Sequence, residues 1–366
     1  MEDLEVISIK ERLMNKEFDL SFYKDKKVLI TGHTGFKGSW MCKMLKLLGA
    51  KVYGYSLNPP TSPSLFDIAK INDDVVSCIG DIRDLTSLKN FFIEVKPDIV
   101  IHMAAQPIVK DSYVDPVYTY ETNVMGTVNV LEATRACGSV KSFLNVTTDK
   151  VYLNNEWCWP YREDDKLDGY DPYSNSKSCS EIVTHSYEKC FMREAGIATS
   201  TARAGNVIGG GDFANFRIVP DCVRAIQNNS EMVIRNPNSI RPYQHVLEPV
   251  YAYLMICAKQ YEDNSFSGAY NIGPNETDCI TTENLVKTFN RYYDNRLMVT
   301  IHSDNGPHEA NLLKLDCSKA KSVFGWQPRW TVEQAVEKVT EWAKAWLGGE
   351  DISAFTESQV REFLNI

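Results

Sequence analysis

Short apolar segments alternate with helix-like segments over residues 26–202, and this rhythm limits the possible folds more than any other feature of the sequence. Strands are expected at 27–31, 51–55, 75–79, 99–103, 142–147 and 198–202, and helices at 36–48, 85–95, 117–136 and 173–195. Strands that alternate with helices pair in parallel through right-handed crossovers. The sequence therefore predicts an α/β fold with a Rossmann-type, doubly wound parallel sheet.

The rhythm becomes irregular after about residue 205, where three consecutive glycines (209–211) and scattered prolines occur. We expect a smaller, mixed α/β substrate domain here, with elements at 269–272, 283–293 and 298–302 and a terminal helix at 331–346. An apolar helix at 246–259 is expected to return to the first domain. The predicted division is an N-terminal extension (1–22), a dinucleotide-binding domain (23–205 plus about 243–265) and a substrate domain (about 206–242 plus 266–366).

Three glycines lie between the first expected strand and the first expected helix. Gly32 permits a tight turn, Gly35 lets the backbone approach a diphosphate, and Gly38 allows close packing of helix on strand. The helix N-terminus then faces the phosphates. This strand–loop–helix context favours dinucleotide binding.

Other cofactor contacts are expected where the next strands end. The second strand ends without the acidic residue that would bind an adenosine ribose, so this position does not separate NAD from NADP. Asp81 and Ile82 follow the third strand, and we expect them on the adenine side. Ala104 and Ala105 follow the fourth strand, and Asn123 lies on the next helix.

Tyr173 and Lys177 lie four residues apart, on one face of an expected helix. A free phenol is only about 0.1% ionised at neutral pH, so its use as a base requires its pKa to fall by roughly 3 units, or about 4 kcal/mol. Lys177 and an oxidised nicotinamide can supply the positive charge. The pair is typical of nicotinamide-dependent oxidoreductases of the short-chain type.

Thr148, Asp149 and Lys150 follow the strand at 142–147 and indicate chemistry beyond hydride transfer. Once a sugar hydroxyl is oxidised to a ketone, the neighbouring C–H becomes acidic and a hydroxyl one carbon further out can leave as water. Thr148 would hydrogen-bond the oxidised hydroxyl, Asp149 would protonate the leaving hydroxyl, and Lys150 is the candidate base. Two alternatives stay open: Lys150 only orients Asp149 while another group is the base, or Asp149 only caps a turn.

Composition excludes several classes of function. The chain has 366 residues and a net charge of −9, which argues against nucleic-acid and anionic-lipid surfaces. No segment is long and apolar enough to span a membrane, and the N-terminus lacks the pattern of a signal peptide. The ten cysteines show no Cys-x2-Cys spacing and are expected to be reduced thiols of a cytoplasmic protein. The histidines form no ligand cluster, so no metal site is predicted.

Several motifs together carry a resemblance to a known family. They are Thr-Asp-Lys at 148–150, Trp-Cys-Trp-Pro-Tyr at 157–161, Tyr-Ser-Asn-Ser-Lys at 173–177 and Arg-Pro-Tyr-Gln-His at 241–245. Over about residues 22–364 the chain resembles the CDP-glucose 4,6-dehydratases, which are extended short-chain dehydrogenase/reductases. The resemblance implies a lyase that converts CDP-glucose to CDP-4-keto-6-deoxyglucose with a retained NAD, for the biosynthesis of deoxysugars in surface polysaccharides.

The resemblance also implies further site residues and an assembly. Phe36 and Lys37 would join the glycine loop at the cofactor. The expected substrate ligands are Gln106, Asn206, Arg217, Arg241, His308 and Glu309, of which Asn206 and the two arginines would hold the diphosphate. The helices at 117–136 and from Tyr173 carry apolar faces that in similar enzymes form a four-helix contact, so a homodimer or homotetramer is expected.

Rival functions share parts of this pattern. Another nucleotide-sugar 4,6-dehydratase would use the same residues on a different nucleotide. A nucleotide-sugar 4-epimerase would use the same fold, cofactor and Tyr173–Lys177 pair but would have no use for Asp149. A non-catalytic dinucleotide sensor is disfavoured because the chain retains both Tyr173 and Lys177.

Overall fold

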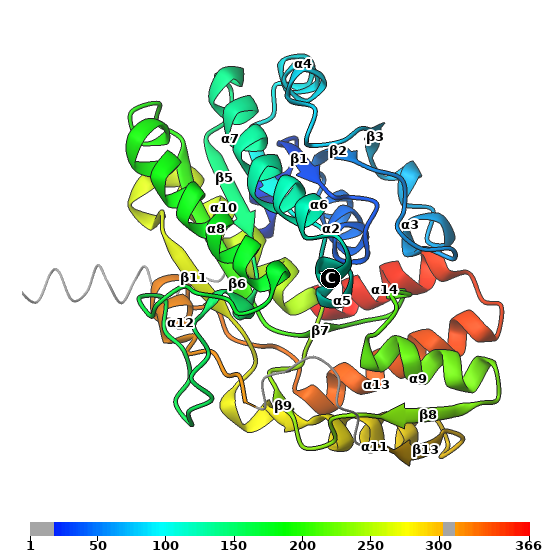
Figure 1. Cartoon of the computed structure of the whole chain (residues 1–366). Helices are drawn as coiled ribbons and strands as arrows, with labels where there is room; N and C mark the ends of the chain where they lie inside the picture. The colour runs from blue at the N-terminus through cyan, green and yellow to red at the C-terminus, as the bar shows by residue number, and fades with distance from the viewer. Residues whose placement is uncertain (1–17, 303–311) are drawn as a thin grey trace, which may run out of the picture.

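The computed structural model describes residues 18–302 and 312–366, so the predictions for residues 1–17, His308 and Glu309 lie outside the described part. At its centre is a seven-stranded sheet in the order β11-β6-β5-β4-β1-β2-β3, with every pair parallel (Figure 1). The strands are β1 (Lys27–Thr31), β2 (Lys51–Ser56), β3 (Val76–Ile79), β4 (Ile99–His102), β5 (Ser142–Val146), β6 (Ala198–Ala204) and β11 (Ala269–Ile272). This order confirms the predicted doubly wound Rossmann-type sheet.

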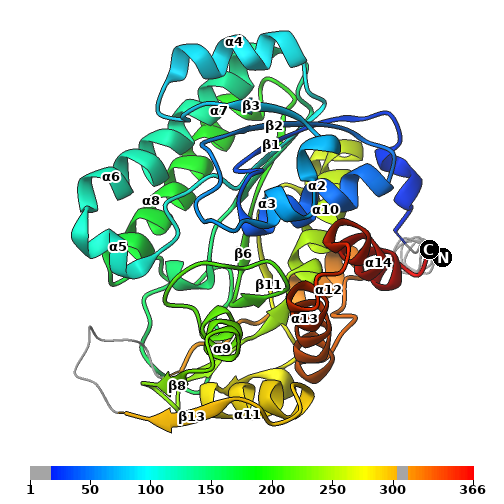
Figure 2. The ribbon, with the colours of Figure 1, turned by 90° about the vertical axis from the view of Figure 1, so that its right-hand side faces the viewer.

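Helices cover both faces of the sheet, which explains the continuous apolar runs of its central strands. One face packs on α2 (Phe36–Leu47), α10 (Leu247–Glu262) and α14 (Ile352–Leu364). The other packs on α4 (Leu85–Val95), α7 (Gly126–Cys137) and α8 (Pro172–Tyr187). Figure 2 shows the two layers on opposite sides of the strands. In β1, Val28 and Ile30 face the first layer and Leu29 the second.

Two elements differ from the expectations. We expected residues 269–272 in the smaller domain, whereas β11 pairs with β6 as the edge strand of the large sheet. We expected the chain to end with the helix at 331–346, whereas α13 (Val332–Leu347) is followed by α14, which Asp351 caps. Long-range packing decides both cases, because Ile272 and Phe363 are buried in the same core as α2 and α10.

The smaller lobe forms below the carboxyl end of the sheet (Figure 1). Its core gathers apolar faces of α9, α11 and α13, including Leu285, Phe289 and Val336. Its elements are β7 (Val207–Ile208), α9 (Ile218–Gln227), β8 (Glu231–Ile234), β9 (Ile240–Arg241), β10 (Gln244–His245), β12 (Ile280–Thr281), α11 (Thr282–Tyr292), β13 (Met298–Ile301) and α13. The helix α12 (Ser318–Phe324) packs instead on β11 and α10 of the large sheet. The exact division into domains stays a prediction.

The remaining helices are short or interrupted. They are α3 (Leu65–Ile68), α5 (Val109–Val114) and α6 (Pro116–Tyr120), with 3-10 turns at Leu20–Tyr23, Ile71–Asp73, Asp149–Val151, Asn264–Phe266 and Glu276–Asp278. The two long helices expected from sequence contain π-helical segments, Glu121–Met125 between α6 and α7 and Glu188–Met192 after α8. Within the described ranges no helix meets the length and hydropathy needed to cross a bilayer.

The described end of the N-terminal extension packs on α10. The Tyr23 hydroxyl donates to the Leu254 carbonyl at 2.7 Å, and the Phe18 ring lies edge-on to Tyr251 at 5.7 Å between centroids. These contacts bury both aromatic side chains in the core of the first layer.

Candidate active site

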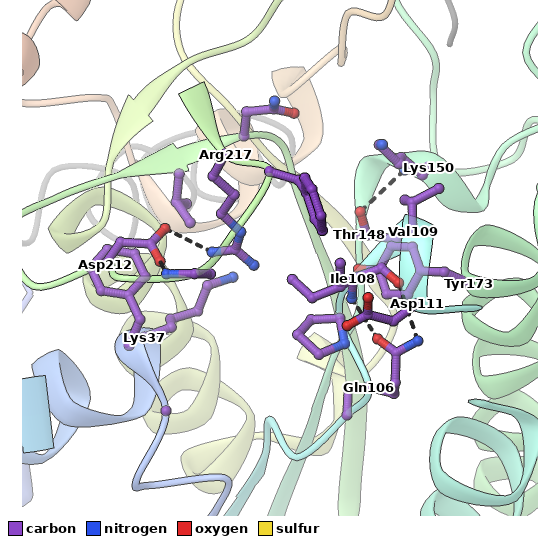
Figure 3. Close-up of a pocket in the computed structure, with 18 of the residues that line it drawn as sticks. Lys37, Gln106, Ile108, Val109, Asp111, Thr148, Lys150, Tyr173, Asp212 and Arg217 are labelled. Atoms are coloured by element: carbon purple, nitrogen blue, oxygen red, sulfur yellow. Dashed lines mark hydrogen bonds and ion pairs between the residues drawn. The ribbon is translucent and has the colours of Figure 1, made fainter. Parts of the chain in front are cut away.

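A cleft of about 1340 Å³ lies between the carboxyl end of the sheet and the smaller lobe. It brings together all of the described residues that the sequence predicts for the site, with the exception of Asn123. They are Gly32, Gly35, Phe36, Lys37, Gly38, Asp81, Ile82, Ala104, Ala105, Gln106, Thr148, Asp149, Lys150, Tyr173, Lys177, Asn206, Arg217 and Arg241. In Figure 3 Thr148, Lys150 and Tyr173 lie on one wall, and Lys37, Asp212 and Arg217 lie on the wall opposite.

The glycine loop is tightly packed where the sequence expects it to be. Gly32 has a φ of +80°, and a Cβ there would lie 2.8 Å from the backbone nitrogen of Ala104. At Gly38 a Cβ would lie 2.2 Å from the Gly32 carbonyl oxygen. Gly35 begins α2 without a side-chain cap, which leaves backbone N–H groups at the helix N-terminus open to an anion. The loop fits a dinucleotide diphosphate.

The loop after β4 is fixed from two sides. Thr31 Oγ1 accepts from the backbone N–H groups of Met103 and Ala104, both at 3.2 Å. Asn123 accepts from the Gln106 N–H at 2.8 Å and donates to the Gln106 carbonyl at 3.1 Å. Asn123 is therefore a buried brace behind the cleft wall. The Gln106 side chain is itself bonded to Ile108 and to Thr119, so it shapes the loop.

Asp81 lies at the expected end of the cleft, but its carboxylate is held by Arg83. The Arg83 Nε and Nη2 atoms donate to Asp81 at 2.7–3.2 Å, and these hydrogen bonds lower the pKa of Asp81. Ile82 is buried against Gly126 at the start of α7. The adenine-side role of both residues stays a prediction.

Asp149 is a buried carboxyl group at the head of the cleft, just after β5. Its Oδ1 accepts from the Thr148 hydroxyl at 3.0 Å, while its Oδ2 is buried with no hydrogen-bond partner among the described residues. Burial raises the pKa of Asp149, against the opposing charge of Lys150. The protonated form, which a general acid requires, is thereby favoured. Thr148 also accepts from the Lys150 N–H and so shapes the whole turn.

Tyr173 and Lys177 project from the first turns of α8, which Asp171 caps. Burial raises the pKa of Tyr173 to about 12, while a hydrogen bond with Thr148 and the charge of Arg217 act in the opposite direction. Burial lowers the pKa of Lys177 to about 8, and its ammonium donates to the Val146 carbonyl at 3.1 Å. Burial is the largest effect on the pKa of Tyr173 in the protein alone. The expectation that Lys177 and an oxidised nicotinamide together lower this pKa stays a prediction.

The opposite wall is cationic. Arg217 Nη1 donates to Asp212 at 2.8 Å, and this ion pair orients the guanidinium at the start of α9. Burial and the charge of Arg217 lower the pKa of Lys37 to about 7. The Lys37 ammonium donates to the Tyr253 hydroxyl of α10 at 3.3 Å. Asn206 and Arg241 complete the lining of this side of the cleft.

A cation–π contact connects the two sides of the cleft. The Lys110 ammonium of α5 lies 4.2 Å from the centroid of the Phe216 ring, in the segment before α9. Phe216 adopts a positive φ of 62°, which is unusual for a bulky residue and directs the segment over the cleft.

Sequence reasoning missed two of the residues that shape this site. Asp212 lies in a glycine-rich run that the sequence marks as a motif, so its pairing with Arg217 five residues later could have been found. Tyr253 lies within a helix that is apolar along its length and gives no local signal. No group of three or more His, Cys, Asp or Glu side chains in the described ranges is arranged to hold a metal ion.

A glycine loop on a Rossmann-type sheet, with the Tyr173–Lys177 pair beside it, defines an enzyme of the short-chain dehydrogenase/reductase class. The sequence profile of one family within this class, described as GDP-mannose 4,6 dehydratase, matches residues 29–339. The chain belongs to that family.

Two relatives illustrate the range of similarity. A CDP-glucose 4,6-dehydratase of Salmonella typhimurium is 46% identical over 353 residues, which is 95% of this chain and 98% of that protein. A dTDP-glucose 4,6-dehydratase of Shigella flexneri is 25% identical over 350 residues, which is 86% of this chain and 92% of that protein. The similarity to the Salmonella typhimurium protein confirms the family resemblance that the sequence motifs indicate.

Solved structures of lower identity share the fold. A UDP-glucose 4-epimerase from Stenotrophomonas maltophila with bound NAD superposes with a TM-score of 0.77 at 22% identity, covering 88% of this chain and 99% of that one. A UDP-glucuronic acid 4-epimerase from Bacillus cereus gives 0.75 at 22% identity, covering 87% and 99%. At this identity the likeness concerns the fold alone.

Proposed function

We propose that the protein is a CDP-glucose 4,6-dehydratase that retains NAD through each cycle and serves deoxysugar biosynthesis. The observation that carries the proposal is Asp149, a buried carboxyl group with a raised pKa that lines the cleft beside Tyr173. A 4-epimerase needs the tyrosine but has no use for a proton donor at this position. The 46% identity to a CDP-glucose 4,6-dehydratase supports CDP as the nucleotide.

The glycine loop would hold the NAD diphosphate at the N-terminus of α2, with Ala104 and Ala105 along its nicotinamide half. When bound there, the nicotinamide would supply a hydride acceptor in its oxidised form and a hydride donor in its reduced form. Its positive charge also opposes the effect of burial on Tyr173, whose pKa of about 12 is too high for a base at neutral pH.

Each proton transfer is then assigned to a different residue of the cleft. Tyr173 takes the proton of the sugar C4 hydroxyl as that carbon is oxidised, with Thr148 bonded to the same oxygen. Lys150 removes the acidic C5 proton, and Asp149 gives its proton to the C6 hydroxyl, which leaves as water. After the hydride returns to C6 and a proton to C5, the net change is the loss of one water.

Arg217 and Arg241, which line the cleft, would hold the diphosphate of the nucleotide sugar, while Lys37 stays assigned to the cofactor. A guanidinium donates two parallel hydrogen bonds to phosphate oxygens, and Arg217 is already oriented for this by Asp212. The same wall serves any nucleotide diphosphate, so it explains the substrate class, while the choice of CDP rests on the relative.

We also infer that the protein is a cytoplasmic homodimer or a homotetramer built from such dimers. Exposed apolar side chains gather on the outer faces of neighbouring helices α5 to α8. They include Val114, Val117, Met125, Ile182 and Phe191, each more than 40% exposed. A second copy would remove this surface from water.

A panel of CDP-, dTDP-, GDP- and UDP-glucose tests the proposal directly. We expect the alkali-induced ultraviolet absorbance of a 4-keto-6-deoxy sugar with CDP-glucose, at a kcat/KM at least about tenfold above the others. A C4 epimer without that absorbance would show that the protein is an epimerase. Preference for another nucleotide would keep the dehydratase chemistry and reject CDP as its substrate.

A further inference from the structure

A buried ion pair lies directly beneath the catalytic residues. Arg203 of β6 and Glu181 of α8 meet at 3.0 Å between Nη2 and Oε2, and their side chains are only 4% and 3% exposed. Removing two charges from water is costly, and such a pair persists only where further hydrogen bonds complete it. Neither residue takes part in the proposed proton transfers. The segments that this ion pair holds in place must therefore explain why the cost is tolerated.

The Glu181 carboxylate joins three elements at one point. Its Oε1 accepts a hydrogen bond from the hydroxyl of Thr147, which directly follows β5. Its Oε2 accepts from the Thr201 hydroxyl of β6 at 2.7 Å, in addition to Arg203. Thr147 immediately precedes Thr148 and Asp149, so this carboxylate fixes the point from which the acid turn leaves the sheet.

Arg203 extends the same network to the far end of that turn. Its Nη1 donates to the Tyr152 hydroxyl and to the Glu163 carbonyl, both at 2.8 Å. The Tyr152 ring stacks on Tyr161 at 5.2 Å between centroids. The segment from Thr147 to Tyr152, which contains Thr148, Asp149 and Lys150, is thus held at both ends by one ion pair.

Glu181 also acts on the other catalytic group through its own helix. Tyr173, Lys177 and Glu181 follow at intervals of four residues, so they share one face of α8. The charged and titratable groups that interact with Lys177 are Glu181, His102 of β4 and Lys37 of α2. Of these three, Glu181 alone is acidic, and its charge raises the pKa of Lys177 against the effect of burial.

We propose that Glu181 is a positioning residue for the reaction: paired with Arg203, it locks the Thr147–Tyr152 turn against α8 and places a carboxylate one helical turn from Lys177. The role in catalysis rests on the proposed function, because it assumes that Tyr173 and Asp149 transfer the protons of the reaction. The effect on Lys177 is a property of the protein alone and is measured without substrate.

The first experiment titrates Lys177 by NMR in protein labelled with carbon-13 at lysine Cε, with its signal assigned by its loss in Lys177→Met. From a wild-type value of about 8, we expect Glu181→Gln to lower the pKa of Lys177 by about one unit. If Glu181→Gln does not fold, the double variant Glu181→Met/Arg203→Met replaces the pair by apolar side chains of similar volume and serves the same measurement. If the pKa of Lys177 in the variant equals the wild-type value, the proposal is overturned.

The second experiment is the pH profile of kcat. We expect Glu181→Gln to lower kcat at least about tenfold and to move the basic limb to lower pH, since Lys177 loses its proton earlier. The matched control is Glu248→Gln, which makes the same change in a buried carboxyl group of α10 that does not line the cleft. We expect the control to keep the wild-type profile.

A lower kcat with an unchanged basic limb of the pH profile would reduce Glu181 to a purely structural role. Because no substrate enters the NMR titration, failure of the dehydratase assay with CDP-glucose would leave that result intact.

Discussion

Asp149 and Glu181 are both buried carboxyl groups, but their surroundings fit them for opposite tasks. One oxygen of Asp149 lacks a partner, and burial raises the pKa of the group. Both oxygens of Glu181 are occupied, and one of them faces a guanidinium. The first environment favours a carboxyl group that can release a proton to a ligand, and the second leaves Glu181 no free oxygen for a ligand.

Asp149→Asn tests the first of these roles. The amide keeps the size of the side chain but donates no proton, so elimination of water should slow by about 10²- to 10⁴-fold while the first hydride transfer survives. The expected result is reduced nicotinamide that accumulates on the enzyme after CDP-glucose is added, measured by its absorbance. Unchanged formation of the 4-keto-6-deoxy product would remove Asp149 from the mechanism.

Gly38→Ala tests the packing of the glycine loop. The new Cβ would lie 2.2 Å from the Gly32 carbonyl oxygen and 2.7 Å from the His33 Cα, and both of these are backbone atoms that cannot turn aside. We expect the loop to shift and the affinity for NAD to fall at least about tenfold, measured by calorimetric titration. Gly138→Ala is the control: its φ of +71° strains the backbone there, but a Cβ meets nothing within 4 Å and Gly138 does not line the cleft. Equal NAD affinity in both variants would contradict this account of the loop.

For single residues, the sequence predicts which side chains form the site better than it predicts their pKa values or their structural roles. The glycines, Thr148, Asp149, Tyr173 and Lys177 could be predicted because their spacing is local and their chemistry is specific. The pKa of Tyr173 could not be predicted, because it depends on burial by segments distant in the sequence. Nor could the internal role of Asn123, which becomes clear only when the loop after β4 is seen to rest on it.

Among the elements, the strands and helices of residues 26–202 follow the predicted ranges closely, because each carries its own apolar pattern. The errors occur where tertiary contacts decide. β11 reads as an isolated short strand but completes the large sheet, and α14 begins shortly after α13 and buries its apolar residues in the core that contains α2 and α10. The strands of the smaller lobe are only two or four residues long and pair with remote segments, so a local sequence pattern cannot predict their pairing.

Helix α10 gives a prediction at the scale of an element. Its buried Glu248 accepts from the backbone N–H groups of Arg329 and Trp330 and joins α10 to the segment before α13. Burial raises the pKa of Glu248 to about 7. A carboxyl group whose pKa is raised in the folded state binds its proton more tightly there than when unfolded. Its contribution to stability therefore falls as pH rises from about 4.5 through about 7.

Glu248→Gln removes this titration while keeping an acceptor oxygen. We expect the free energy of unfolding of wild type, relative to the variant, to fall by up to about 3 kcal/mol between about pH 5 and about pH 8. Urea unfolding of both proteins at the two pH values measures the difference, and titrations common to both cancel. A difference that does not change with pH would mean that Glu248 has the same pKa in both states.

For the whole molecule, the exposed apolar side chains on α6 and α8 lead to a prediction about assembly. Val117 and Ile182 are 66% and 57% exposed on neighbouring helices. The double variant Val117→Lys/Ile182→Lys places charges on this face and should lower the mass in solution to that of one chain, measured by light scattering. Val76→Lys is the control, since Val76 is 60% exposed on the edge strand β3, away from this face. An unchanged mass in the double variant would place the interface elsewhere.

The burial of Lys37, with cations beside it, has a thermodynamic consequence for the molecule as a whole. With a pKa of about 7, about half of the Lys37 side chains are neutral at pH 7. A dianionic diphosphate beside this amine would restore its full charge. Capture of the nucleotide should therefore draw protons from solution, and the heat of binding should vary with the ionisation enthalpy of the buffer.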